Sequence, residues 1–107
     1  MIKNLFFNYE DYKLEKFQLE NLATSMVPFT FFSLDPIPKI NGLEARILSS
    51  IKYSKSPFEE LEKIQFNKEN PLVFICLKGK KSQKAVKKAV SAGFKNVYFI
   101  EGGLESF

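Results

Sequence analysis

The chain contains a single cysteine, Cys76, at the end of a hydrophobic run that begins at Leu72. A short segment with a glycine, Gly79, follows it and leads into a predicted helix. Backbone N–H groups of such a loop point back at the preceding side chain, and a helix N-terminus carries partial positive charge. Both effects favour the thiolate, which is the reactive form of cysteine. A lone cysteine is otherwise a common core residue, but this setting makes Cys76 the candidate nucleophile.

Several other chemistries are excluded by composition. The chain has no histidine, which removes Ser-His-Asp and Cys-His mechanisms and the commonest metal ligand. One cysteine allows neither an intramolecular disulfide nor a cysteine zinc cluster. We therefore expect no metal and no cofactor, and any activation of Cys76 must come from backbone dipoles and nearby cations.

The formal net charge is +4, and the basic residues are unevenly distributed. Residues 78–88 contain six lysines and no acidic residue. Lysines at a helix start oppose the helix dipole by about 0.3–1 kcal/mol each, so stability alone does not explain Lys80 and Lys81. We hypothesise that Lys78, Lys80 and Lys81 steer an anionic ligand toward Cys76, whereas the later lysines form a solvated helix face.

Length and hydropathy indicate one domain spanning residues 1–107. The chain is 45% hydrophobic and has 12 phenylalanines, enough apolar surface for a core. No apolar run is long enough to cross a membrane. The N-terminal stretch becomes acidic too early for a secretory signal, so we expect a cytoplasmic protein.

The second half of the chain has a clear pattern of elements. Residues 72–75 form a short, continuously apolar segment typical of a buried parallel strand. A helix is predicted from Ser82, as N-cap, to about residue 92, with Gly93 ending it. The next strand spans 96–100, and strand, helix and strand together predict a right-handed βαβ unit. In α/β sheets ligands bind at the carboxyl ends of strands, where Cys76 lies.

The first half is less regular. We expect a short helix over residues 19–26, a strand over 27–34 and a very short strand over 51–53. Residues 35–50 are a loop in which 42–48 could form a helical turn. Ser56 is predicted to cap a helix that starts at Pro57, with Glu59 at the capping-box position.

The motifs of the second half resemble those of the rhodanese (sulfurtransferase) family. That family has a strand followed by Cys-x-x-Gly-x-Arg-Ser/Thr, a helix, a Gly-Phe-x-Asn-Val motif, a strand and a Gly-Gly pair. Here these are the segments 72–82, 92–98 and 101–104, and Phe107 stands near the usual tryptophan. The resemblance implies an α/β fold of the rhodanese-like three-layer α/β/α type, with a mostly parallel five-stranded sheet.

The first half departs from the family pattern. Asp35 matches the acid of an Asp-x-Arg motif, but Ile37 stands at the arginine position. Residues 45–50 align with Gly-His-Ile-Pro-Gly-Ala, with Arg46 in place of the histidine, and Lys81 replaces the loop arginine. We expect Asp35 and Arg46 at the pocket rim, with Asp35 accepting a hydrogen bond from a loop N–H.

The resemblance also implies an activity. The cysteine of a rhodanese takes a sulfane sulfur from an anionic donor such as thiosulfate, becomes a persulfide, and passes the sulfur to a thiophilic acceptor, which can be a protein. Cys76 would be the nucleophile, and its sulfur would lie in the cradle formed by Leu77, Lys78, Gly79, Lys80, Lys81 and Ser82.

Three other functions are alternatives to sulfur transfer. A phosphatase related in fold would need a longer loop with an arginine to grip phosphate, and no arginine occurs in residues 76–82. A rhodanese-fold module that binds a small anion or a partner protein without turnover stays open, although the retained cysteine argues against it. Nucleic-acid binding is disfavoured because no aromatic residues interleave with the lysines.

Overall fold

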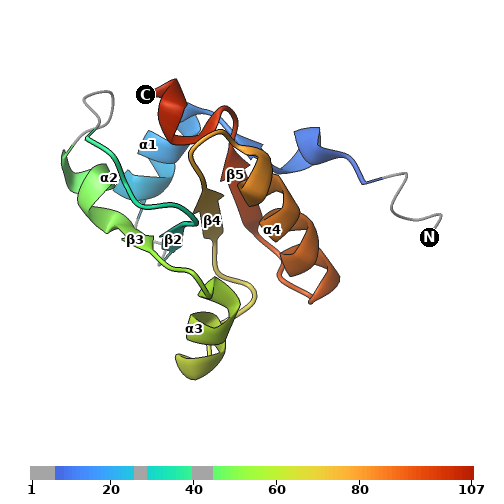
Figure 1. The fold of residues 1–107 in the computed structure, drawn as a ribbon. Helices are drawn as coiled ribbons and strands as arrows, with labels where there is room; N and C mark the ends of the chain where they lie inside the picture. The colour runs from blue at the N-terminus through green and yellow to red at the C-terminus, as the bar shows by residue number, and fades with distance from the viewer. Residues whose placement is uncertain (1–6, 26–28, 40–44) are drawn as a thin grey trace.

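Five strands form one sheet in the computed structural model, which describes residues 7–25, 29–39 and 45–107. The strand order is β1-β5-β4-β2-β3, and every pairing is parallel (Figure 1). The strands are β1 (Lys13–Leu14), β2 (Thr30–Ser33), β3 (Ile51–Tyr53), β4 (Leu72–Ile75) and β5 (Val97–Ile100). The expected five-stranded α/β sheet is confirmed.

Four helices cover the two faces of this sheet. They are α1 (Lys16–Thr24), α2 (Ala45–Ser50), α3 (Pro57–Lys63) and α4 (Lys80–Ser91). Leu19 of α1 and Ile47 of α2 pack on one face, whereas Leu61 of α3 and Val86 of α4 pack on the other. Figure 1 shows α1 and α2 close together and α4 on the opposite side of the central strands.

The central strand β4 explains why the core has two halves. Its side chains alternate between the faces, so Val73 and Ile75 join one apolar cluster and Leu72 and Phe74 join the other. All four are 0% exposed. A strand buried on both faces must be continuously apolar, as the sequence of residues 72–75 is.

Helix α4 begins three residues earlier than predicted. Gly79, not Ser82, is the N-cap, and its backbone is left-handed with φ of 97°. Glycine takes this conformation at no steric cost, so the chain turns sharply into the helix and Ser82 falls inside the first turn. The predicted end is confirmed: Gly93 has φ of 94°, and the N–H of Phe94 bonds the carbonyl of Ala89 in a Schellman arrangement.

The other boundaries shift by a few residues. Helix α1 begins at Lys16, which is earlier than predicted. The Gln18 side chain accepts a hydrogen bond from the Glu15 N–H and so caps the helix at this position. Helix α3 begins at Pro57 as predicted, but the Ser56 side chain makes no capping bond, so the capping box is wrong. Ser54 Oγ accepts from the Ser56 N–H instead, at 3.1 Å.

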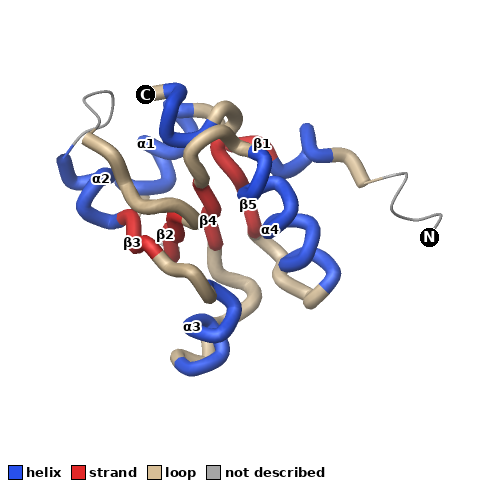
Figure 2. Tube along the Cα trace, viewed as in Figure 1, coloured by secondary structure: helices blue, strands red, loops and turns tan. Residues whose placement is uncertain are grey.

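Some predictions lie partly outside the described residues. Met26 at the end of the first predicted helix, residues 27–28 of the predicted strand and residues 42–44 of the predicted helical turn are among them. Among the described residues, three elements were not predicted at all: the 3₁₀ helices η2 (Tyr9–Tyr12) and η3 (Gly103–Ser106), and strand β1, which pairs with β5 (Figure 2). Within the described ranges, no helix has the length and apolar character needed to cross a membrane.

Candidate active site

Cys76 follows β4 directly and lies at the carboxyl ends of the strands. Its side chain is buried, with 1% of the residue exposed, and it reaches the floor of an open pocket of about 280 Å³. The pocket is lined by Asp35, Cys76, Leu77, Lys78, Lys80 and Lys81. The cysteine, the loop after it and the acid that follows β2 therefore meet at one place, although β2 and β4 are separated by about 40 positions in the sequence.

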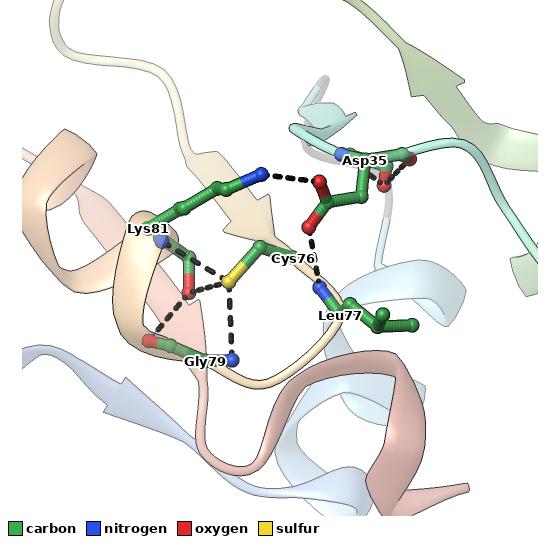
Figure 3. Close-up of polar contacts among 7 residues, drawn as sticks. Asp35, Cys76, Leu77, Gly79 and Lys81 are labelled. Atoms are coloured by element: carbon green, nitrogen blue, oxygen red, sulfur yellow. Dashed lines mark hydrogen bonds and ion pairs between the residues drawn. The ribbon is translucent and has the colours of Figure 1, made fainter.

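Two backbone N–H groups point at the Cys76 sulfur (Figure 3). Sγ accepts from the Gly79 N–H at 3.1 Å and from the Ser82 N–H at 3.3 Å. Both donors belong to the start of α4, where the helix dipole is positive. Fixed donors of this kind stabilise negative charge without having to reorganise, so the loop is built to hold an anionic sulfur.

The Ser82 hydroxyl adds a third contact. In the thiol form, Cys76 donates its S–H to Ser82 Oγ at 3.4 Å, and Ser82 donates its O–H to the Gly79 carbonyl at 3.0 Å. A thiolate or persulfide has no such proton on Sγ. Rotation of the hydroxyl then gives the sulfur a donor in place of an acceptor, at the cost of the bond to Gly79.

For the persulfide formation that the family resemblance implies, we predict that Ser82→Ala slows the reaction by about tenfold to hundredfold, since a hydrogen bond to a charged group contributes about 1.5–3 kcal/mol. The rate is measured by intact-protein mass after mixing with thiosulfate. Ser91→Ala is the matched control, because Ser91 is an exposed residue of the same helix. Equal rates in the two variants would show that the hydroxyl has no part in the reaction.

Asp35 connects β2 to the cysteine loop. Its Oδ2 accepts from the Leu77 N–H at 2.8 Å, and its Oδ1 accepts from Lys81 Nζ at 2.6 Å. The hydrogen bond from Lys81 is the main cause that lowers the pKa of Asp35, and the hydrogen bond from the Leu77 N–H is the second. The hydrogen bond to Asp35 in turn raises the pKa of Lys81. Ser33 Oγ donates to the Asp35 carbonyl at 2.6 Å and holds this turn. The Asp35 carboxylate is thus ionised, and both of its oxygens already accept hydrogen bonds, from Leu77 and from Lys81.

The turn at Gly102 and Gly103 holds the cysteine loop from the other side. The Leu104 N–H donates to the Cys76 carbonyl at 2.8 Å, and the Glu105 N–H donates to the Leu77 carbonyl at 3.0 Å. Both donors belong to the 3₁₀ helix η3 (Gly103–Ser106). These bonds turn the loop carbonyls away from the sulfur, which leaves N–H groups to face it.

Gly103 fits this place because it has no side chain. A Cβ at this position would lie 2.1 Å from the Cys76 carbonyl oxygen. The sequence did not identify Gly103 as part of the site. The Gly-Gly pair after β5 could be seen in the sequence, but the role of Gly103 depends on its contact with the cysteine loop, which only the structure shows.

The other predicted site residues divide into two groups. Lys78 and Lys80 are exposed at the pocket, whereas the charge of Lys81 is offset by Asp35, contrary to the expectation that it is free to steer an anion. Arg46 lies on α2 and, among the described residues, does not line this pocket, and its place at the rim stays a prediction. The part of the chain that the structure describes holds no cluster of three acidic, cysteine or histidine side chains for a metal ion.

Comparison with known proteins shows the family of this chain and agrees with its fold. The rhodanese-like domain model matches residues 40–107, which is more than half of the chain, and the chain belongs to the rhodanese-like domain family. The structure of a NAD-dependent persulfide reductase from A. fulgidus is similar, with a TM-score of 0.58 at 19% sequence identity. That likeness shows the fold and covers 94% of this chain but 17% of the reductase. No match was found among curated proteins.

Proposed function

We propose that this protein is a cytoplasmic sulfurtransferase whose Cys76 carries sulfur as a persulfide. The observation that carries the proposal is the pair of backbone N–H groups, from Gly79 and Ser82, that point at the cysteine sulfur. An anionic sulfur chain needs such donors, and a core cysteine does not. Membership of the rhodanese-like family supports the same chemistry.

The first step loads the cysteine from a donor such as thiosulfate. The Cys76 thiolate attacks the outer sulfur of thiosulfate, a new bond forms between that sulfur and Sγ, and the sulfur–sulfur bond of the donor breaks. The electron pair of the broken bond leaves with sulfite. Lys78 and Lys80 stand at the pocket and favour the approach of the dianion.

The second step empties the site. A thiophilic acceptor attacks the outer sulfur of the persulfide, and the electron pair of the bond to Sγ returns to Cys76 as a thiolate. With cyanide as acceptor the product is thiocyanate. The cradle serves both steps, because Sγ is negatively charged before loading and again after transfer.

The proposal is tested by intact-protein mass after incubation with thiosulfate and removal of the excess. We expect the wild type to gain one sulfur atom, and cyanide or a reductant to remove it. Cys76→Ser is expected to gain nothing, since it keeps the fold but lacks the nucleophile. A reduced wild-type thiol that gains no sulfur would reject the proposal and favour a domain that binds an anion or a partner without turnover.

A further inference from the structure

The outward side of α4 carries a row of lysines. Lys80, Lys84, Lys87 and Lys88 lie at helical positions i, i+4, i+7 and i+8, which share one face. The opposite face is buried against the sheet through Ala85, Val86 and Ala89. Lys78, in the loop before the helix, extends the row to the pocket. These five residues, Lys78, Lys80, Lys84, Lys87 and Lys88, are called the lysine row below.

The charge of the lysine row is uncompensated. Within the described ranges, its members form no ion pair, whereas the neighbouring Lys81 is paired with Asp35. Lys87 and Lys88 instead have their ammonium groups 5.9 Å and 4.7 Å from the ring centroids of Phe7 and Phe58. These five lysines carry five positive charges, more than the formal net charge of +4 of the whole chain.

The lysine row is too long for a small anion. At 1.5 Å per residue, Lys80 and Lys88 are separated by about 12 Å along the helix. Within the lysine row, Lys78 and Lys80 line the pocket, and Lys84, Lys87 and Lys88 do not. A donor the size of thiosulfate is served by the first two alone. A row of positive charge that begins beside Cys76 and continues along α4 matches the size of a negatively charged surface on a macromolecule.

A protein fits this surface better than a nucleic acid does. Strand-like nucleic acids are bound by stacking bases on exposed aromatic rings, and the rings beside the row, Phe7 and Phe58, are partly buried in the core. The most exposed phenylalanine of the described chain, Phe17, lies on α1 at the other face of the sheet. Acidic side chains require only the ammonium groups.

We propose that the lysine row docks an acidic protein surface whose own cysteine takes the sulfur from Cys76. The inference rests on the proposed function and names the class of acceptor. The outer sulfur of the Cys76 persulfide first takes a proton from water, and the thiolate of the partner then attacks this sulfur of Cys76–S–SH. The bond from that sulfur to Sγ breaks and leaves its electron pair on Cys76, and the outer sulfur keeps its proton as the persulfide of the partner. Docking places the two sulfurs together and keeps the persulfide from other thiols.

The test compares two synthetic peptides that share one cysteine, flanked by glutamates in one and by glutamines in the other. Each protein variant is first loaded to the same extent, checked by mass, and each transfer rate is divided by the rate to the neutral thiol 2-mercaptoethanol. We expect the glutamate peptide to be at least about tenfold faster at low salt, the lower end of electrostatic steering. The preference is expected to vanish near 1 M salt, where screening reaches about 3 Å.

Matched charge reversals locate the surface. Lys84→Glu/Lys87→Glu is expected to abolish the preference for the glutamate peptide. Lys16→Glu/Lys95→Glu changes the net charge equally, at exposed positions away from the lysine row, and is expected to keep the preference. Equal rates for the two peptides in wild type, or equal loss in both double variants, would overturn the proposal.

Two further outcomes distinguish a failure of the docking surface from a failure of the proposed function. If Cys76 does not load, the proposed function fails, and docking is then judged by fluorescence anisotropy with a glutamate peptide in which serine replaces the cysteine. Binding that is lost only in Lys84→Glu/Lys87→Glu would uphold the acidic docking surface, and no binding would reject it. A single-stranded oligonucleotide that binds more tightly than this peptide would reject it in favour of a nucleic-acid surface.

Discussion

Gly103→Ala is expected to destabilise the protein by about 3–5 kcal/mol, combining overpacking with the cost of a left-handed alanine. The new Cβ would lie 2.1 Å from the Cys76 carbonyl oxygen and 2.8 Å from both the Gly79 nitrogen and the Leu77 carbonyl oxygen. All three atoms are backbone, so none can rotate away. Gly103 itself has φ of 65°. The measurement is the free energy of unfolding in urea.

Gly93→Ala is the control for this prediction. Gly93 also has a left-handed backbone, with φ of 94°, but a Cβ there would meet only atoms of the flexible Lys68 side chain, at 3.9 Å. We expect a loss of about 1–2 kcal/mol, the conformational cost alone. Equal losses in the two variants would contradict a tight fit at Gly103. Any folded Gly103→Ala protein is also expected to load sulfur more slowly, because its loop carbonyls are displaced.

Lys81→Ala is expected to raise the KM for thiosulfate about fivefold, which corresponds to the roughly 1 kcal/mol of one like-charge contact at about 4 Å in water. The variant leaves the Asp35 carboxylate unpaired at the pocket, where it repels the dianion. Asp35 keeps its bond to the Leu77 N–H, so the loop retains its shape. Thiosulfate-dependent turnover at varied donor concentration gives the KM.

Asp35→Asn in the Lys81→Ala background separates two roles of the lysine. Asparagine keeps an oxygen for the Leu77 N–H and removes the charge, so the double variant is expected to regain the wild-type KM. A KM that stays high would mean that Lys81 binds the donor directly, as the sequence-based hypothesis has it. The cycle isolates the coupling of the two side chains because they touch at 2.6 Å.

The second half of the fold was predictable because its signals are local. The bounds of β4 were correct, since a short, continuously apolar run is typical of a parallel strand buried on both faces. Gly93 ends α4 through its own backbone conformation. The position of Cys76 at the carboxyl ends of the strands follows from the same pattern, so the candidate nucleophile and its loop could be placed from the sequence.

What the sequence did not reveal depends on distant contacts. Strand β1 is two residues long and is defined by pairing with β5, more than 80 positions away. Asp35 and Lys81 form an ion pair although they are 46 positions apart. From the sequence, Asp35 was interpreted only as an acid at a strand end and Lys81 as a lysine without a partner. Gly103 gains its role only where η3 meets the cysteine loop. Each of these features arises from the order of strands in the sheet, which no local periodicity encodes.

The two outer strands decide how this sheet can meet other chains. Strands β1 and β3 have two and three residues, and each carries a lysine, Lys13 or Lys52, held in ion pairs with neighbouring glutamates. Short edges with charged side chains offer too few open backbone groups to template a further strand. At the described edges of the sheet, recognition by strand addition is therefore disfavoured. We expect partners to contact side chains instead, and aggregation through these sheet edges is disfavoured in the folded state.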